Sequence, residues 1–136
     1  MMRYSALAVI VLSLVWGVQC AEKVNDNKAI LGTWRGGWPD DKTDRFELVI
    51  TADKITGKDL MGNRTMGAGT FTLDLAKKTI DNKGTEGPSN YKTFQGIYTL
   101  EGDVLKWASN NGHGPRPSEM IHKPGSSFLM VLKKMK

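Results

Sequence analysis

The chain has 136 residues, a formal net charge of +5, 15 glycines and a single cysteine, Cys20. A single cysteine excludes an internal disulfide framework, and this length suits one domain with an ordinary hydrophobic core. The basic residues are spread along the chain except for the run 133–136, whereas a nucleic-acid-binding protein gathers them on one face or stripe. We therefore expect no nucleic-acid partner.

Residues 1–20 have the layout of a secretory signal peptide. Residues 1–3 give a positive start, and residues 6–15 are apolar and uncharged. This run is shorter than the roughly 20 apolar residues of a membrane-spanning helix, so we expect no permanent membrane span. We predict cleavage after Cys20 and a secreted or periplasmic domain over residues 21–136.

Cys20 also allows a second interpretation, as the lipid-carrying first residue of a bacterial lipoprotein. Such signals carry a small residue immediately before the cysteine and a leucine-like residue three positions before it. Gln19 and Gly17 occupy these positions and fit poorly. Lipoprotein anchoring is therefore the less favoured alternative.

The rest of the chain predicts short strands after one helical turn. Residues 24–30 suit that turn, with Asn25 or Asp26 as its amino-terminal cap. Turn residues then recur every eight to twelve positions between segments that alternate in polarity, such as Phe46–Ile50. The predicted strands are 33–38, 46–50, 54–60, 70–75, 77–81, 93–100, 104–108, 118–122 and 127–133, with a mobile loop at 82–90.

These elements predict an all-β fold. Roughly eight or nine strands follow one another with short turns, and no helix is long enough for a parallel crossover. Sequential antiparallel strands can close into an up-and-down barrel, which removes exposed edges. We expect one antiparallel, lipocalin-like barrel of about eight strands, with Gly32 and Trp34 of the Gly-x-Trp motif marking its first strand.

Several motifs together resemble a known family. It is the lipocalin-like extracytoplasmic domain of unknown function that is expanded in planctomycete bacteria, and the resemblance covers Ala29 to Lys134. The matching motifs are Leu31–Trp34, Ile55–Lys58, Thr72–Asp74, Lys77–Asp81, Gly96–Trp107, Arg116–Met120 and Leu132–Lys134. The resemblance implies a barrel outside the cytoplasm and brings no established activity with it.

The wider resemblance to lipocalins implies roles for residues at one barrel end. In lipocalins the tryptophan of Gly-x-Trp closes that end, and an arginine from the last strand stacks on it. Trp34 fits the first role, whereas Lys133 and Lys134 stand where the arginine is expected. A lysine can still make a cation–π contact, although it lacks the planar stacking of a guanidinium group.

Catalytic and metal-binding patterns are missing from the sequence. His113 lies in a glycine-rich turn, and His122 is expected at the end of a strand. Two histidines nine residues apart, without clustered carboxylates, do not form a zinc signature. We therefore expect no enzyme activity, no metal and no cofactor.

The candidate binding residues are three aromatic residues and one arginine. Trp38, Tyr98 and Trp107 combine apolar area with a polar atom and would suit the lining of an open barrel, although burial in the core is the more common role. Arg116 lies between Pro115 and Pro117, which stiffen the backbone around it. It could bind an anion at the barrel mouth, or it could brace its loop through backbone carbonyls.

Two functions remain open at this point. The first is binding of a small hydrophobic or amphipathic ligand inside the barrel. The second is a cell-envelope interaction module, in which a solid barrel presents its loops to an envelope protein. The two differ in whether the barrel interior has room for a ligand.

Overall fold

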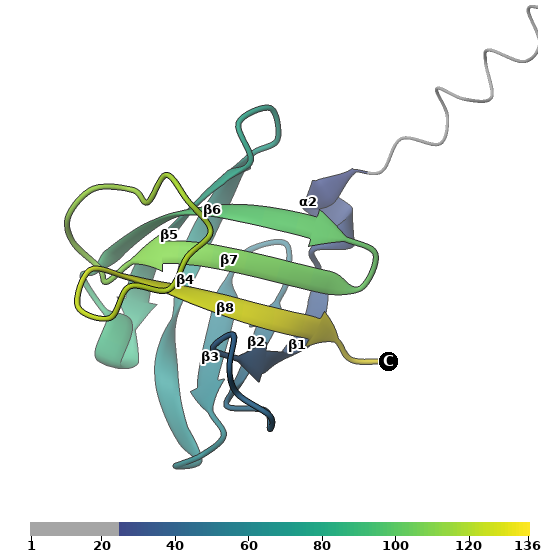
Figure 1. Cartoon of the computed structure of the whole chain (residues 1–136), viewed down its shortest axis with the longest axis vertical. Coiled ribbons are helices and arrows are strands. Elements are labelled where there is room, and N and C mark those ends of the chain that lie inside the picture. The colour runs from purple at the N-terminus through teal and green to yellow at the C-terminus, as the bar shows by residue number, and fades with distance from the viewer. Residues whose placement is uncertain (1–24) are drawn as a thin grey trace, which may run out of the picture.

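The computed structural model describes residues 25–136, which form one closed antiparallel barrel. Its eight strands follow one another around the barrel in chain order, and β8 pairs with β1 to close it (Figure 1). The elements are α2 (Asp26–Ala29), β1 (Gly32–Gly37), β2 (Phe46–Ile50), β3 (Ile55–Asp59), β4 (Arg64–Asp74), β5 (Thr79–Glu86), the 3-10 turn η1 (Gly87–Ser89), β6 (Thr93–Glu101), β7 (Val104–Asn110) and β8 (Ser127–Lys134). The expected all-β, up-and-down barrel is confirmed.

The alternation in sequence accounts for the core. In β2, Phe46, Leu48 and Ile50 are buried while the residues between them are not. The other strands contribute inward side chains in the same way, since successive residues of a strand face opposite sides. The buried cluster is Ile30, Trp34, Phe46, Leu48, Ile50, Ile55, Ile80, Tyr98, Leu105, Trp107, Met130 and Leu132.

The helical turn before β1 forms as expected. Asn25 is its amino-terminal cap, and its side-chain oxygen accepts a hydrogen bond from the Asn27 N–H at 2.9 Å. The predicted hairpin over 93–108 also forms as β6 and β7, with Gly102 at a φ of 61° in the turn between them. The predicted signal peptide and Cys20 lie outside the described residues.

The prediction of a mobile loop over 82–90 is wrong for its first half. β5 continues to Glu86 and pairs with β4 as far as Ala68. Its polar residues alternate poorly, but the neighbouring strands supply the hydrogen bonds that keep the segment extended. β4 likewise begins at Arg64, earlier than the sequence pattern indicated.

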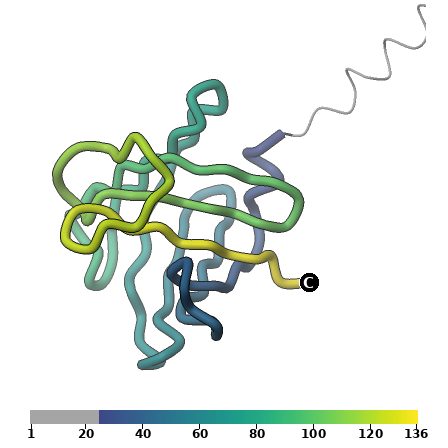
Figure 2. The backbone as a smooth tube through the Cα atoms, in the orientation of Figure 1, coloured from purple at the N-terminus to yellow at the C-terminus, as the bar shows by residue number. Residues whose placement is uncertain are grey.

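The predicted strand at 118–122 is also wrong. This part of the chain belongs to a long loop, whose strand-like pairing with β8 is limited to the bridge between Lys123 and Ser127 (Figure 2). β8 pairs with β7 over residues 127–133 and with β1 over residues 131–134, so only 127–130 leave an open edge for the loop. At that edge the His122 side chain, and not a backbone carbonyl, accepts the Leu129 N–H, so no second ladder forms.

Candidate functional site

One end of the barrel, here called the sealed end, is closed by α2 and by Trp34. The Trp34 indole is fully buried, and its Nε1 donates to the Ile30 carbonyl at 2.8 Å. Lys134 Nζ lies 5.4 Å from the centre of the Trp34 ring and donates to the Ala29 carbonyl at 3.0 Å. A lysine of the last strand therefore makes the cation–π contact that lipocalins make with arginine.

A glycine is needed at position 32, next to the contact between Lys134 and Trp34. Its φ of 135° lies in a region that side chains with a Cβ disfavour, and an added Cβ would stand 2.9 Å from Lys134 Cε. Gly32 thus lets the chain turn from α2 into β1 while Lys134 crosses over it. This geometry gives the Gly-x-Trp motif a structural role.

A second polar contact fastens α2 to the barrel at the sealed end. Tyr98 is 1% exposed, and its hydroxyl donates to Asp26 Oδ2 at 2.8 Å. Lys78 Nζ donates to the same oxygen at 2.7 Å. Burial alone would raise the pKa of Asp26, but these two hydrogen bonds and the Lys78 charge outweigh it and lower that pKa. Burial and the Asp26 carboxylate raise the pKa of Tyr98.

The opposite end, here called the loop end, carries an aromatic cluster around Trp38. The Trp38 ring centre lies 4.8 Å from that of Phe46, 4.7 Å from that of His122 and 5.8 Å from that of Phe128. Phe128 in turn lies 6.5 Å from Phe94. Side chains from β2, β6, β8, the long loop and the turn that follows β1 therefore meet here.

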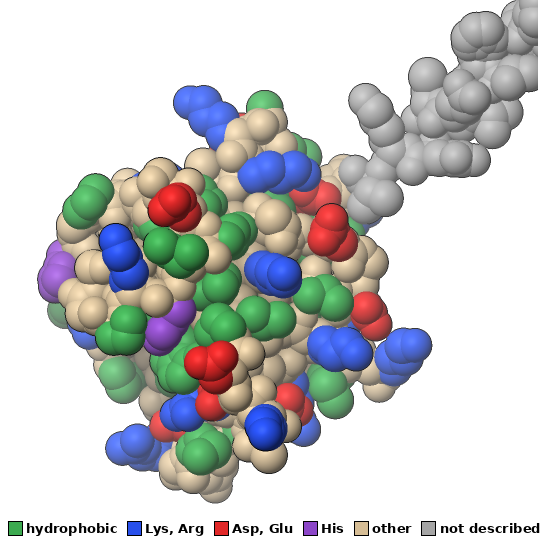
Figure 3. Space-filling view, in the orientation of Figure 1, with side chains coloured by type: hydrophobic (Ala, Val, Ile, Leu, Met, Phe, Trp, Pro, Cys, Tyr) green, Lys and Arg blue, Asp and Glu red, His purple; other side chains and the backbone are tan. Residues whose placement is uncertain are grey.

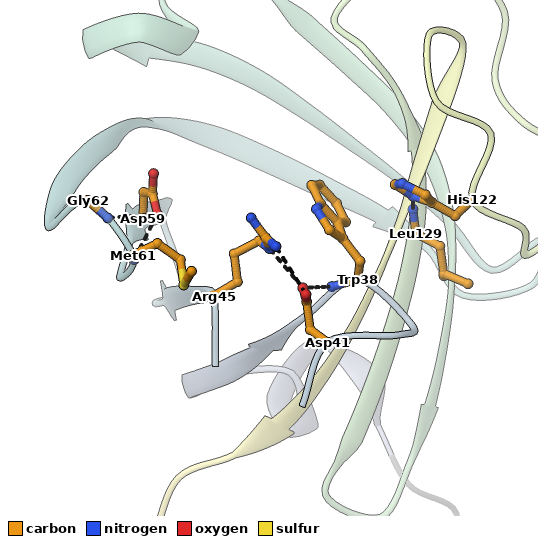
Figure 4. Close-up of polar contacts among 8 residues, drawn as sticks. All are labelled: Trp38, Asp41, Arg45, Asp59, Met61, Gly62, His122 and Leu129. Carbon is orange, nitrogen blue, oxygen red and sulfur yellow. Dashed lines mark hydrogen bonds and ion pairs between the residues drawn. The ribbon is translucent and has the colours of Figure 1, made fainter. Parts of the chain in front are cut away.

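Two polar side chains, Asp41 and His122, hold this cluster in place (Figure 4). Asp41 Oδ2 accepts hydrogen bonds from the Trp38 N–H and from Arg45 Nε, each at 2.8 Å. Together these two hydrogen bonds lower the pKa of Asp41 to about 2, and the bond from Arg45 contributes more than the bond from Trp38. On the other side of the Trp38 ring, His122 Nδ1 accepts the Leu129 N–H at 3.1 Å and so ties the long loop to β8.

A cavity of about 90 Å³ opens between the strands near this cluster, and we call it the mouth cavity. Its lining is mostly apolar: Leu48, Ile55, Gly57, Met66, Gly67, Ala68, Asn82, Ser89, Phe94, Phe128 and Met130. Asn82 Oδ1 is buried and has no hydrogen-bond partner among the described residues. The cavity thus combines mostly apolar walls with one amide side chain, whose oxygen lies beside Gly69.

A groove of about 360 Å³ adjoins the mouth cavity, since the two share Met66, Ser89 and Phe94. We call it the rim groove. It is lined by Asp59, Arg64, Thr65, Met66, Pro88, Ser89, Lys92 and Phe94. An apolar pocket with a wider, more polar approach is therefore present at the loop end.

Another cavity, of about 560 Å³, lies along β1 and β8. Its lining mixes both charges, including Lys42, Lys133, Asp44 and Asp103. The face shown in Figure 3 likewise intersperses blue and red side chains. This cavity therefore offers no single chemistry to a ligand.

The sequence-predicted site residues do not come together around the mouth cavity. Tyr98 is bonded at the sealed end, and Trp107 is buried in the core, where its Nε1 lies beside Gly96 without a described hydrogen-bond partner. Trp38 packs in the aromatic cluster, next to Phe128 of the cavity wall. Trp34 closes the sealed end.

Arg116 braces its loop. Its Nη1 donates to the Gly96 carbonyl at 2.9 Å and lies 2.7 Å from Asp81 Oδ1. The Asp81 carboxylate is thus a close ionic partner of Arg116. Arg116 is thus engaged by the barrel wall, in agreement with the bracing role considered above.

The sequence did not indicate which residues line the mouth cavity, because two of them lie in strand segments that its pattern did not predict. Met66 and Asn82 belong to the parts of β4 and β5 that the sequence pattern did not indicate as strands. Phe94 faces the interior at the start of a predicted strand, and this is the one signal that could have identified it.

Within residues 25–136, no three His, Cys, Asp or Glu side chains gather as a metal site. No helix of that part of the chain is long and apolar enough to cross a bilayer. Comparisons of the chain with protein-family models, with curated proteins and with solved structures find no match.

Proposed function

We propose that the protein is an exported, lipocalin-like barrel that binds a small, partly apolar molecule in the mouth cavity. The observation that carries the proposal is an apolar cavity with one unpaired buried acceptor, Asn82 Oδ1. Buried polar atoms in native proteins almost always have a partner. When the Asn82 side chain turns this oxygen from Gly69 towards the cavity, a ligand hydroxyl or amide N–H would supply the partner that it lacks.

The volume limits the size of the bound group. At about 90 Å³, the cavity is smaller than the roughly 150 Å³ apolar cavity that accepts benzene. It therefore holds only a few heavy atoms, with the rest of a ligand in the rim groove. Met66 and Met130 line the cavity, and flexible thioether side chains can adjust to ligands of different shape.

The test is a titration with small alcohols from 1-butanol to 1-hexanol, followed by two-dimensional ¹H–¹⁵N NMR and calorimetry. We expect saturable shifts confined to residues around the mouth cavity. Ala68→Ile fills the cavity from β4 and should abolish binding without lowering the melting temperature. Thr70→Ile is the matched control, because Thr70 lies on the same strand and is exposed.

Two results would overturn the proposal. One is the absence of saturable shifts with any of the alcohols, which would favour the interaction-module alternative with a solid barrel. The other is binding that survives Ala68→Ile, since such binding would occur elsewhere on the protein.

A further inference from the structure

The rim groove has a net positive charge at the entrance to the mouth cavity. Its charged lining residues are Arg64, Lys92 and Asp59. Arg64 Nη2 lies 3.3 Å from Asp59 Oδ2, so these two charges compensate each other. Lys92 has no ion-pair partner among residues 25–136, which leaves one cation unmatched in the groove.

Asp59 is occupied by more than Arg64. Its Oδ1 accepts the Met61 N–H at 2.9 Å and the Gly62 N–H at 3.3 Å in the turn between β3 and β4 (Figure 4). Partial burial opposes ionisation of Asp59, but these bonds and Arg64 together lower its pKa. Its carboxylate is therefore committed to its own turn and does not reach out to neutralise Lys92.

The position of Lys92 is fixed by the fold around it. An added Cβ on Gly112 would stand 3.1 Å from Lys92 Cδ, so the aliphatic part of the lysine packs along the long loop. Its backbone N–H donates to the Ser89 carbonyl at 3.0 Å, and its carbonyl accepts the Gly84 N–H at 2.8 Å. These contacts place the backbone and the first carbons of Lys92, and the rest of the side chain is exposed.

The preceding backbone is strained to hold this arrangement. Tyr91 has a φ of 70°, a left-handed conformation that residues with a Cβ disfavour, and its side chain is 93% exposed. Beneath the turn, Gly67 leaves room for Ser89, whose Oγ would lie too close to an added Cβ. The chain thus turns sharply between β5 and β6, and it returns with Lys92 and Phe94 on the groove wall.

We propose that the ligand of this site is an anionic amphiphile, in its simplest form a carboxylate on a short apolar chain. This inference rests on the proposed function. The chain enters the mouth cavity past Met66 and Phe94, which line both spaces. The carboxylate stays in the rim groove between Lys92 and Arg64. Groove and cavity together then match one molecule with a charged head and an apolar tail.

The experiment compares three probes of equal chain length at pH 7, namely hexanoate, 1-hexanol and hexylammonium, by calorimetry. Hexanoate should bind about two- to fivefold more tightly than 1-hexanol, the range expected for an exposed contact between an anion and cations. Hexylammonium should bind most weakly. Raising the salt concentration should weaken binding of hexanoate and leave binding of 1-hexanol unchanged.

Variants separate the charge from the cavity. Lys92→Met keeps the aliphatic packing and should reduce hexanoate affinity towards that of 1-hexanol, while 1-hexanol affinity stays the same. Arg64→Met is the second test at this groove and should act in the same direction. Lys106→Met is the matched control, because Lys106 is exposed on β7 and does not line the groove.

The outcomes distinguish this inference from the function on which it rests. Equal affinities for hexanoate and 1-hexanol would overturn the anionic ligand and leave binding in the mouth cavity intact. So would an unchanged preference for hexanoate in Lys92→Met and Arg64→Met. Failure of both hexanoate and 1-hexanol to bind would overturn the proposed function and this inference with it.

Discussion

Replacing Tyr98 with phenylalanine tests how the sealed end is held. The change removes one hydroxyl, whose hydrogen bond to the Asp26 carboxylate is 2.8 Å long, and keeps the ring in the core. A hydrogen bond to a charged group contributes about 1.5–3 kcal/mol. Lys78 still satisfies Asp26 in the variant, so we expect the lower part of that range, about 1.5–2 kcal/mol. For a domain of this size, that corresponds to a melting temperature lower by roughly 6–8 °C.

The assay is urea unfolding at pH 7, monitored by tryptophan fluorescence, since Trp34 is fully buried in the folded barrel. Lys78→Met is the comparison: its side chain is 54% exposed, and pairs of this exposed kind contribute only about 0.2–1 kcal/mol. Tyr98→Phe should therefore lower the free energy of unfolding by more than Lys78→Met does. A loss below about 0.5 kcal/mol for Tyr98→Phe, or one no larger than for Lys78→Met, would refute the reasoning.

The same contact predicts a loss of stability in alkali. The pKa of Tyr98 is raised in the folded protein, so above pH about 10 an unfolded tyrosine ionises while folded Tyr98 keeps its proton. The stability contributed by the neutral hydroxyl is complete below that pH and is lost as the pH rises towards the folded pKa. Tyr98→Phe should lack this component of the alkaline loss. An identical alkaline profile in the two proteins would contradict the prediction.

Three further predictions concern both ends of the barrel. Gly32→Ala should cost about 1–3 kcal/mol in urea unfolding, because it strains the backbone and displaces Lys134; no loss would contradict the role given to Gly32. The Asp41 carboxyl should titrate by ¹³C NMR near pH 2, and its stabilising contribution should be present above pH about 4 and lost as the pH falls towards 2; a midpoint near 4 would contradict its pairing. His122→Phe keeps the ring against Trp38 but removes the acceptor of the Leu129 N–H, so amide exchange at Leu129 should quicken; unchanged exchange would exclude this tie.

The sequence predicts the barrel because the local patterns, alternating polarity in the strands and glycine in the turns, are those that an antiparallel barrel requires. In the hairpin over 93–108, alternating polarity and a glycine turn both specify neighbouring antiparallel strands. The errors arise where tertiary context decides. The polar end of β5 is a strand because β4 pairs with it. Residues 118–122 are not a strand because β1 occupies the edge of β8 over 131–134, and a side chain, His122, takes the Leu129 N–H on the part that stays open.

The site could not be predicted in the same way, because it depends on register and not on residue type. Tyr98 has the composition of a ligand-binding residue, but its partner Asp26 lies 72 positions away, and only the closed barrel brings them together. Asn82 looked like a loop residue, and only its inward position between Phe94 and Phe71 turns it into part of a cavity wall. Local patterns carry no information on such contacts.

The two barrel ends differ in how completely their polar atoms are paired. At the sealed end, Trp34 Nε1, the Tyr98 hydroxyl and Lys134 Nζ all have hydrogen-bond acceptors within the chain. Towards the loop end, Asn82 Oδ1 is buried without one. An unpaired buried polar group costs about 1–3 kcal/mol, so Asn82 near the loop end and Trp107 in the core each retain such a cost, and at the loop end a ligand could offset it. The binding proposal therefore belongs at the loop end, with Trp34 assigned to the scaffold.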